Sequence, residues 1–435
     1  MISEIVNPSK VKSADIVVGI PSYNEADSIY FPVEQASKGL SIYFPSQSSV
    51  IVNIDNCSED GTRDAFLNTP TKVPKIYAST DKGVRGKGRN VRNLFEIATG
   101  LGAKSIILLD ADLKSLTPMW IKYFMEPLKD GYDFVVPIYM RHKYDGTITN
   151  NIAYPMLRTL FGIRIRQPIA GDFAISGRLA ECLLQESTWD EDIHNFGIDI
   201  WMTTLAMCRN FKVCQAFLGS TKTHRPKDPA SDLGPMFSQV VGTIFKLIKK
   251  FAYVWKHVQE SRPSVIYGFG LGQSGVSEEV KVNTDLLHKS FIQGFEDYGH
   301  IWQQVLMPSN MQVVQRLSEV DPEQFHYEDD EWVRVLFDFA LASIFNKQIE
   351  NEKLLEALIP LYYSCTLSFV NRVSKMDDAE TELYLEDRSR RFEESKYYLM
   401  ERWNQLTRQN GNRRFYKMLS DQEVNEELSG ESYSD

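Results

Sequence analysis

Short apolar segments rich in β-branched residues alternate with longer amphipathic stretches over the first third of the chain. Four such segments are found at residues 16–20, 50–55, 105–109 and 134–138. Polar turns bound these segments, and continuous apolar runs of this length are typical of strands buried on both faces. Strands separated by helical stretches predict a doubly wound α/β sheet with right-handed crossovers.

Beyond residue 250 the pattern changes to helical periodicity. Apolar residues recur at three- and four-residue spacing in three stretches, residues 332–346, 354–373 and 383–403. This spacing predicts amphipathic helices, whose apolar stripes must pack against the sheet or against a second copy in a homodimer. A glycine-rich interruption at residues 269–275 is a linker or a loop over a site.

These patterns divide the chain into three parts: a sheet domain (residues 1–250), a mostly α-helical C-terminal domain (251–420) and an acidic tail (421–435). The tail contains six acids and no base. Because such a segment cannot bury apolar surface, we expect it to be disordered.

Composition narrows the class of protein. With 435 residues, 43% hydrophobic and 24% charged, the chain has the make-up of an average globular protein of two or three domains. No apolar run approaches the roughly 18 residues of a membrane helix, and residues 1–5 lack a secretory leader pattern, so we expect a cytoplasmic protein.

A net charge of −10 argues against nucleic-acid binding. Five cysteines without a CxxC pair indicate reduced core thiols.

Polar residues gather where the predicted strands end, which is where doubly wound sheets bind ligands. They are Asn24, Glu25, Asp55, Asn56, Asp110 and Asp112. Asp110 and Asp112 project to the same side of an extended segment, and the small Ala111 leaves room for a nucleotide. Two carboxylates there could hold a divalent cation beside a diphosphate. A helix cap or a loop turn is the alternative for so short a motif.

Further motifs follow in a recognisable order: IPSYNE (20–25), GKG (86–88), DAD (110–112), QPIAGD (167–172), FGID (196–199) and THRP (223–226). This order resembles the GT-A glycosyltransferases and, among them, the glucosyl-3-phosphoglycerate and mannosylglycerate synthases. The resemblance implies a Rossmann-like mixed sheet and small-molecule substrates. It also implies transfer of glucose or mannose, with retention, from a UDP- or GDP-linked donor to D-glycerate or 3-phosphoglycerate.

The same resemblance implies roles for individual residues. Asp112 and His224 would bind Mg²⁺ or Mn²⁺, and Lys87 would contact the diphosphate, where nearby glycines permit close backbone approach. Pro21, Tyr23, Glu25, Asp55, Asp110 and Ala111 would hold the nucleotide, and Ile169, Asp172 and Asp199 would lie at the donor sugar. The alternatives are helix caps for Glu25, Asp55 and Asp199, and a solvated or core histidine for His224. The expected mechanism is front-face attack, in which the acceptor passes its proton to the leaving phosphate.

The acceptor loop departs from the family pattern. Phosphoglycerate-using relatives have an arginine where this chain has Thr147, although Thr149 is retained and Arg225 follows the histidine. The sequence offers four other cations to bind an acid: Arg141, Lys143, Arg164 and Arg166. This leaves free glycerate or another small acid beside 3-phosphoglycerate, and we expect Thr147→Arg to favour the phosphorylated acid.

Other functions remain open from the sequence. A lipid, glycan or protein could be the acceptor of a GT-A transferase. A sugar nucleotidyltransferase shares the sheet and the acidic site, but it normally has a glycine-rich GxGxR-type loop after the first strand, which residues 20–25 lack. An inactive GT-A domain could also serve as a binding module.

Overall fold

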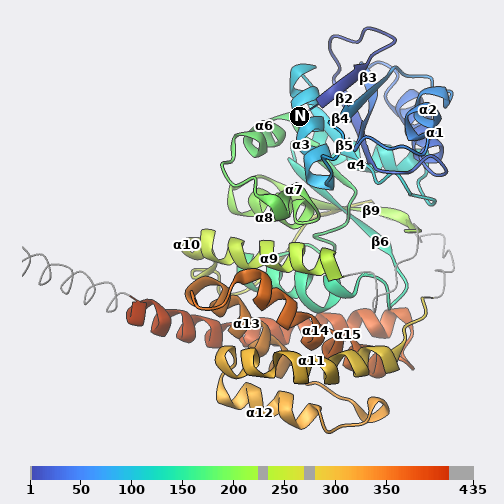
Figure 1. Cartoon of the computed structure of the whole chain (residues 1–435). Coiled ribbons are helices and arrows are strands. Elements are labelled where there is room, and N and C mark those ends of the chain that lie inside the picture. Colours follow the sequence, from blue (N-terminus) through green and yellow to red (C-terminus); the bar gives the residue numbers. More distant parts are fainter. Residues whose placement is uncertain (1, 224–233, 269–279, 411–435) are drawn as a thin grey trace, which may run out of the picture.

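The computed structural model describes residues 2–223, 234–268 and 280–410. Within these ranges a nine-stranded sheet has the order β1-β4-β3-β2-β5-β8-β6-β9-β11 (Figure 1). Its strands are β1 (Ile2–Val6), β2 (Ile16–Ser22), β3 (Ser49–Asp55), β4 (Lys75–Thr80), β5 (Ser105–Leu108), β6 (Phe134–Met140), β8 (Phe173–Ser176), β9 (Val213–Thr221) and β11 (Ile266–Tyr267). A second, two-stranded sheet pairs β7 (Ile163–Arg164) with β10 (Arg262–Pro263).

The four predicted strands are confirmed as β2, β3, β5 and β6. The sheet is mixed, because β8 runs antiparallel between β5 and β6, while β2 is parallel to both β3 and β5. The antiparallel register pairs Leu108 at the end of β5 with Phe173 at the start of β8. The loop before β8 therefore lies beside the DxD segment that follows β5.

Helices cover both faces of the sheet. They are α1 (Tyr30–Tyr43), α2 (Thr62–Asn68), α3 (Lys87–Gly100), α4 (Pro118–Lys129), the π-helical turn η1 (Thr149–Ala153), α5 (Tyr154–Phe161), α6 (Gly177–Gln185), α7 (Glu191–His194), α8 (Ile198–Cys208), α9 (Gly234–Lys250) and α10 (Ala252–Trp255). Helices α1 and α4 pack together on one side, and α3 packs with α6 on the other. This arrangement confirms the doubly wound architecture.

The C-terminal part of the chain is helical, as predicted. It contains α11 (Thr284–Val305), α12 (Pro308–Leu317), a 3₁₀ turn (Pro322–Gln324), α13 (Asp329–Phe345), α14 (Asn351–Val373) and α15 (Asp378–Glu394). The predicted helix at 383–403 is broken by a turn at Ser395, after which residues 396–410 are helical again. The glycine-rich stretch at 269–275 and the acidic tail at 421–435 lie outside the described residues.

Helix α9 joins the two parts of the molecule. Figure 1 shows α9 between the sheet and the C-terminal helices, and it contacts both α13 and α14. One hydrophobic core runs from the sheet into the C-terminal helices. A domain boundary at residue 250 stays a prediction, since the apolar core is continuous across that point.

Polar contacts tie the segment from 143 to 158 to the C-terminal helices. Arg158, 4% exposed, bonds to Glu386 at 2.5 Å and Glu393 at 2.8 Å, both on α15. The indole of Trp332 donates to the carbonyl of Asn151 at 3.0 Å. The C-terminal helices therefore support the segment in which the predicted acceptor loop lies.

Two expectations from composition can be compared with the structure. No disulfide joins the five cysteines, all of which lie in the described ranges; Cys214 and Cys365 are buried and the other three are half-buried, so the reduced state stays a prediction. Across the described ranges, no helix has both the length and the apolar character needed to cross a membrane.

We predict that Arg158→Met lowers the free energy of unfolding by about 3 kcal/mol, the lower end of the cost of breaking a buried ion pair. The loss should be at that end because Glu386 is 46% exposed and can rehydrate. Urea unfolding followed by far-UV circular dichroism measures it. Arg390→Met on α15, the helix that carries Glu386, removes an exposed arginine paired with Asp387; it is the control and should leave the unfolding midpoint unchanged. Equal midpoints for the two variants would contradict the buried-pair role.

Candidate active site

A cavity of about 560 Å³ opens at the carboxyl ends of the central strands, where the sequence places the polar residues. Twelve predicted site residues line it: Pro21, Tyr23, Glu25, Lys87, Asp110, Ala111, Asp112, Arg141, Thr147, Thr149, Ile169 and Asp199. Asp55 and Asp172 are fully buried outside this lining. His224 and Arg225 lie outside the described residues. The fold thus brings most of the predicted site together.

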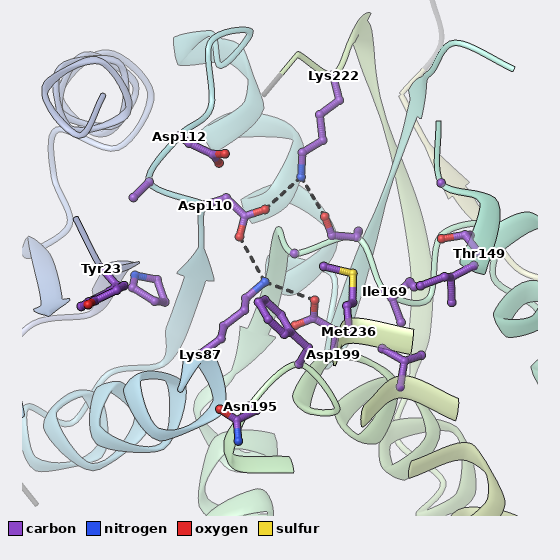
Figure 2. Close-up of a pocket in the computed structure, with 18 of the residues that line it drawn as sticks. Tyr23, Lys87, Asp110, Asp112, Thr149, Ile169, Asn195, Asp199, Lys222 and Met236 are labelled. Carbon is purple, nitrogen blue, oxygen red and sulfur yellow. Dashed lines mark hydrogen bonds and ion pairs between the residues drawn. The ribbon is translucent and has the colours of Figure 1, made fainter. Parts of the chain in front are cut away.

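The centre of the cavity is a network of charged side chains (Figure 2). The ammonium of Lys87, at the start of α3, donates to Asp110 at 3.1 Å and to Asp199 at 3.2 Å. Burial alone would lower the pKa of Lys87, but the two carboxylates outweigh it and hold that pKa above its ordinary value. Burial raises the pKa of Asp199. Lys87 therefore carries a stable positive charge in the middle of the site.

A second lysine, Lys222, completes the network and was missed in the sequence. Its ammonium group donates to Asp110 at 3.1 Å and to Asp172 at 2.8 Å. Burial would raise the pKa of Asp110, but Lys87 and Lys222 outweigh it and hold that pKa well below its usual range. A signal existed in the sequence, because Lys222 stands two residues before His224, the predicted metal ligand.

The loop before β8 is fitted closely to Asp110. Gly171 has φ +88°, and a Cβ atom there would lie 2.2 Å from Asp110 Oδ2. The backbone N–H of Asp110 donates to Asp172 Oδ1 at 2.9 Å. Both oxygens of Asp172 are thus used inside the protein, which favours a supporting role over the predicted contact with sugar hydroxyls.

The segment next to His224 is anchored near the DxD motif. Thr223 accepts a hydrogen bond from the backbone N–H of Lys114 at 3.0 Å and donates its own N–H to Ser115 Oγ at 3.0 Å. Lys114 and Ser115 follow Asp112 closely in the sequence. The described chain therefore stops one residue before His224, beside the turn that carries Asp112.

One side of the cavity lies around Tyr23, a predicted nucleotide-binding residue. The guanidinium of Arg85 stacks over the Tyr23 ring at 4.5 Å, and both residues line the cavity. The Oδ1 atoms of Asn56 and Asn90 are buried in the same lining without a hydrogen-bond partner within the described structure. Tyr23 is a predicted site residue and Asn56 belongs to the polar cluster predicted at the strand ends, whereas Asn90 and Arg85 were not predicted as site residues. Together these side chains offer stacking surface and polar groups to a ligand.

Asp55 is used internally. Its carboxylate accepts hydrogen bonds from Ser22 Oγ at 3.1 Å, from Tyr77 Oη at 2.9 Å, and from the backbone N–H and hydroxyl of Ser58 at 2.9 and 2.6 Å. With four hydrogen bonds and no exposed surface, the side chain organises the loop after β3, which favours neither the predicted nucleotide contact nor the helix cap that was the alternative.

The glycines around Lys87 serve the protein's own packing. A Cβ atom on Gly86 would lie 2.2 Å from the carbonyl oxygen of His194, and one on Gly88 would lie 1.8 Å from that of Ile193. The sequence predicts that these glycines let the backbone approach a phosphate closely. In the structure they let the backbone pack closely against α7 instead. It fixes the start of α3, and with it the position of Lys87.

At the other end of the cavity, the predicted acceptor loop meets the C-terminal helices. The hydroxyl of Thr147 lies 2.6 Å from the hydroxyl of Tyr362 on α14, and both residues are buried. Arg141 donates to Tyr139 Oη at 2.6 Å, and its ring contact with Tyr139 is 4.9 Å. Figure 2 shows Thr149 and Tyr23 on opposite sides of the lysine–carboxylate network.

Three of the four cations expected at this end lie elsewhere. Lys143 donates to the carbonyls of Val373, Ser374 and Met376 at the end of α14. Arg164 donates to Ser261, and Arg166 makes a two-pronged contact with Glu382. The prediction that these side chains form the anion pocket is wrong, because backbone carbonyls, the Ser261 hydroxyl and the Glu382 carboxylate hold them outside the cavity lining. Of the four, Arg141 lines the cavity.

The expected effect of Thr147→Arg also needs correction. Thr147 has no exposed surface and faces Tyr362 directly. A larger, charged side chain there must displace the tyrosine, so overpacking would offset any new anion contact.

Comparisons with known proteins agree with this architecture. Residues 17–180 match the family model described as Glycosyl transferase family 2. Among proteins of curated function, none matches the sequence. The family match and the mixed sheet show a GT-A-like domain followed by a mostly helical region.

Similar solved structures include three of glucosyl-3-phosphoglycerate synthase from Mycobacterium tuberculosis. One is a complex with Mn²⁺, UDP-glucose and phosphoglyceric acid, at 22% identity and a TM-score of 0.44, covering 54% of this chain and 80% of that one. A second contains Mg²⁺ and UDP, at 22% identity and a TM-score of 0.43, covering 54% and 79%. A third contains UDP, at 21% identity and a TM-score of 0.43, covering 54% and 80%.

We predict that Gly171→Ala destabilises the protein by about 1–3 kcal/mol more than Gly131→Ala, because it adds a clash to the backbone strain. The two glycines form a matched pair: φ is +88° and +83°, but a Cβ atom on Gly131 would meet nothing within 4 Å. Urea unfolding of both variants gives the difference. If the two substitutions cost the same, contact with Asp110 does not constrain position 171.

Proposed function

We propose that this protein is a metal-dependent, retaining glycosyltransferase that moves glucose or mannose from a UDP- or GDP-linked sugar to a small hydroxy acid. The observation that carries the proposal is the single cavity that contains the DxD segment, Lys87, an aromatic-cationic end at Tyr23 and an acceptor end at Arg141. The family match over residues 17–180 supports the reaction class.

The donor would lie from Tyr23 to Asp199. Tyr23 and Arg85 offer a stacked surface for the base. An ammonium group can donate three hydrogen bonds, and Lys87 makes two within the described residues, so one N–H remains for a diphosphate oxygen. Asp199 Oδ1 is buried without a partner among the described residues, and it would accept a hydrogen bond from a sugar hydroxyl.

The carboxylates of this chain suit a hard divalent cation. Asp112 lines the cavity on the turn after β5, and the chain approaches His224 next to that turn. We propose that Asp112 and His224 hold Mg²⁺ or Mn²⁺, as the motif order implies. A cation bound there would supply positive charge to the diphosphate as it leaves.

The chain's own residues would then organise the transfer. Lys87 would hold the diphosphate, and Asp199 would orient the sugar. Ile169, Met236 and Val240 line the cavity with apolar surface that limits water near the reacting carbon. In front-face attack the acceptor hydroxyl would pass its proton to the departing phosphate oxygen, so no protein base is required.

The acceptor would lie between Arg141 and Thr149. Arg141 supplies a guanidinium for a carboxylate, and Thr149 supplies a hydroxyl. Tyr362 covers Thr147, the position where phosphoglycerate-using relatives place a second cation. These contacts support an acid with one carboxylate, such as glycerate, over 3-phosphoglycerate. The cytoplasmic location and the homodimer stay predictions.

We predict that Asp112→Ala lowers kcat at least 100-fold at saturating Mn²⁺, because it removes a ligand that positions charge at the leaving group. The assay measures nucleoside diphosphate release from a panel of UDP- and GDP-sugars with glycerate. Asp130→Ala, which removes a carboxylate outside the cavity lining, is the control and should keep wild-type turnover. NMR should show that the product has the same anomeric configuration as the donor sugar. Near-normal turnover of Asp112→Ala would contradict the metal assignment. A product whose anomeric configuration is opposite to that of the donor would contradict retention.

We predict that Arg141→Gln raises KM for the acid acceptor at least tenfold, while hydrolysis of the donor without acceptor changes less than threefold. Loss of a charge-assisted hydrogen bond costs about 1.5–3 kcal/mol, which corresponds to such a change. Arg166→Gln is the matched control, because Glu382 holds that side chain away from the cavity. An unchanged KM for Arg141→Gln, or transfer to a lipid or protein instead, would overturn the acceptor proposal.

A further inference from the structure

Lys222 is the most buried charged side chain of the cavity lining, at 3% exposure. It follows β9, and its ammonium donates to Asp110 Oδ2 at 3.1 Å, Asp172 Oδ2 at 2.8 Å and the carbonyl oxygen of Ala170 at 2.8 Å. An ammonium group has three N–H donors. All three are therefore used by the protein, so Lys222 has no donor left for a substrate.

Lys87 provides the contrast. It makes two contacts, to Asp110 and Asp199, and its side chain is 19% exposed. Both lysines touch Asp110, one on each carboxylate oxygen. Their surroundings assign them different tasks: Lys87 can bind a ligand, whereas Lys222 binds only the protein.

The three partners of Lys222 come from two separate segments. Asp110 follows β5, and Ala170 and Asp172 belong to the loop before β8. The backbone N–H of Asp110 already donates to Asp172 Oδ1, so Lys222 closes a small ring with these two carboxylates. Together these contacts fix the DxD segment relative to the loop at the floor of the cavity.

The network also reaches the acceptor end. The carbonyl of Ala170 accepts a second hydrogen bond from Tyr139 Oη at 3.1 Å, and Tyr139 in turn accepts one from Arg141 at 2.6 Å. A continuous path of hydrogen bonds therefore runs from Arg141 through Ala170 and Lys222 to Asp110. Lys222 stands at the point where the donor and acceptor sides meet.

We propose that Lys222 is a positioning residue, which holds the Asp110 carboxylate in register with residues 170–172 and itself binds no substrate. This inference rests on the proposed transferase function for its kinetic consequences but not for its structural ones. Burial alone would lower the pKa of Lys222, but Asp172, Tyr139 and Asp110 outweigh it, and the lysine stays charged.

Substitution of Lys222 alone would not show whether the lysine positions Asp110 or only neutralises Asp172. Lys222→Met leaves the buried Asp172 carboxylate without a counter-charge, which is destabilising by itself. The decisive comparison is between Asp172→Asn and Asp172→Asn combined with Lys222→Met. Both have a neutral side chain at 172, and they differ only in the lysine. Lys246→Met is the control, since Lys246 pairs with Asp190 and Asp192 outside the cavity and should keep wild-type kcat.

If Lys222 positions Asp110, the double variant should unfold within a few degrees of Asp172→Asn, and its kcat should be at least tenfold lower. Equal kcat values would overturn the inference and leave Lys222 as the counter-charge of Asp172.

If the wild type transfers no sugar, the proposed function fails instead. Crystal structures of the same two variants then decide about Lys222: movement of the Asp110 carboxylate away from Ala170 in the double variant supports positioning, and an unmoved carboxylate refutes it.

Discussion

Two lysine ammonium groups held among three carboxylates, two of them buried and that of Asp110 half-buried, are the constraint on which the cavity depends. Charges removed from water are costly unless they are paired and hydrogen bonded. Asp110, Asp172 and Asp199 must therefore meet Lys87 and Lys222, although these residues come from five separate points in the chain. The antiparallel strand β8 and the glycine at 171 allow this meeting, because they bring the loop before β8 against Asp110.

The helical half of the chain is part of the site's construction. Tyr362 on α14 covers the proposed acceptor loop at Thr147, and α15 holds Arg158 just beyond that loop. The cations at 143, 164 and 166 bind to the same half. The surface that would receive an acceptor is thus shaped by residues more than 200 positions away, and changes in the C-terminal helices can alter specificity without touching the DxD segment.

Several residues show why composition and motif order predict only part of a site. Asp112, Lys87 and Asp199 occupy the cavity as their motifs imply. Asp55 and Asp172 carry the same chemical group, yet their oxygens are consumed by neighbours inside the protein. Whether a carboxylate faces a ligand or a buried partner depends on contacts that are distant in sequence, so the motif alone leaves both outcomes open.

The sequence by itself determined the doubly wound sheet, three of the C-terminal helices and the strand ends at which the site forms. Local apolar periodicity is enough for that, because it records which faces must be buried. Only the tertiary structure decided that Lys222 belongs to the site, that Arg141 alone of four candidate cations lines the cavity, and that Tyr362 covers Thr147. A charged side chain is equally compatible with a ligand, a carboxylate or a helix end, and the partner it finds is set by the packing of distant elements.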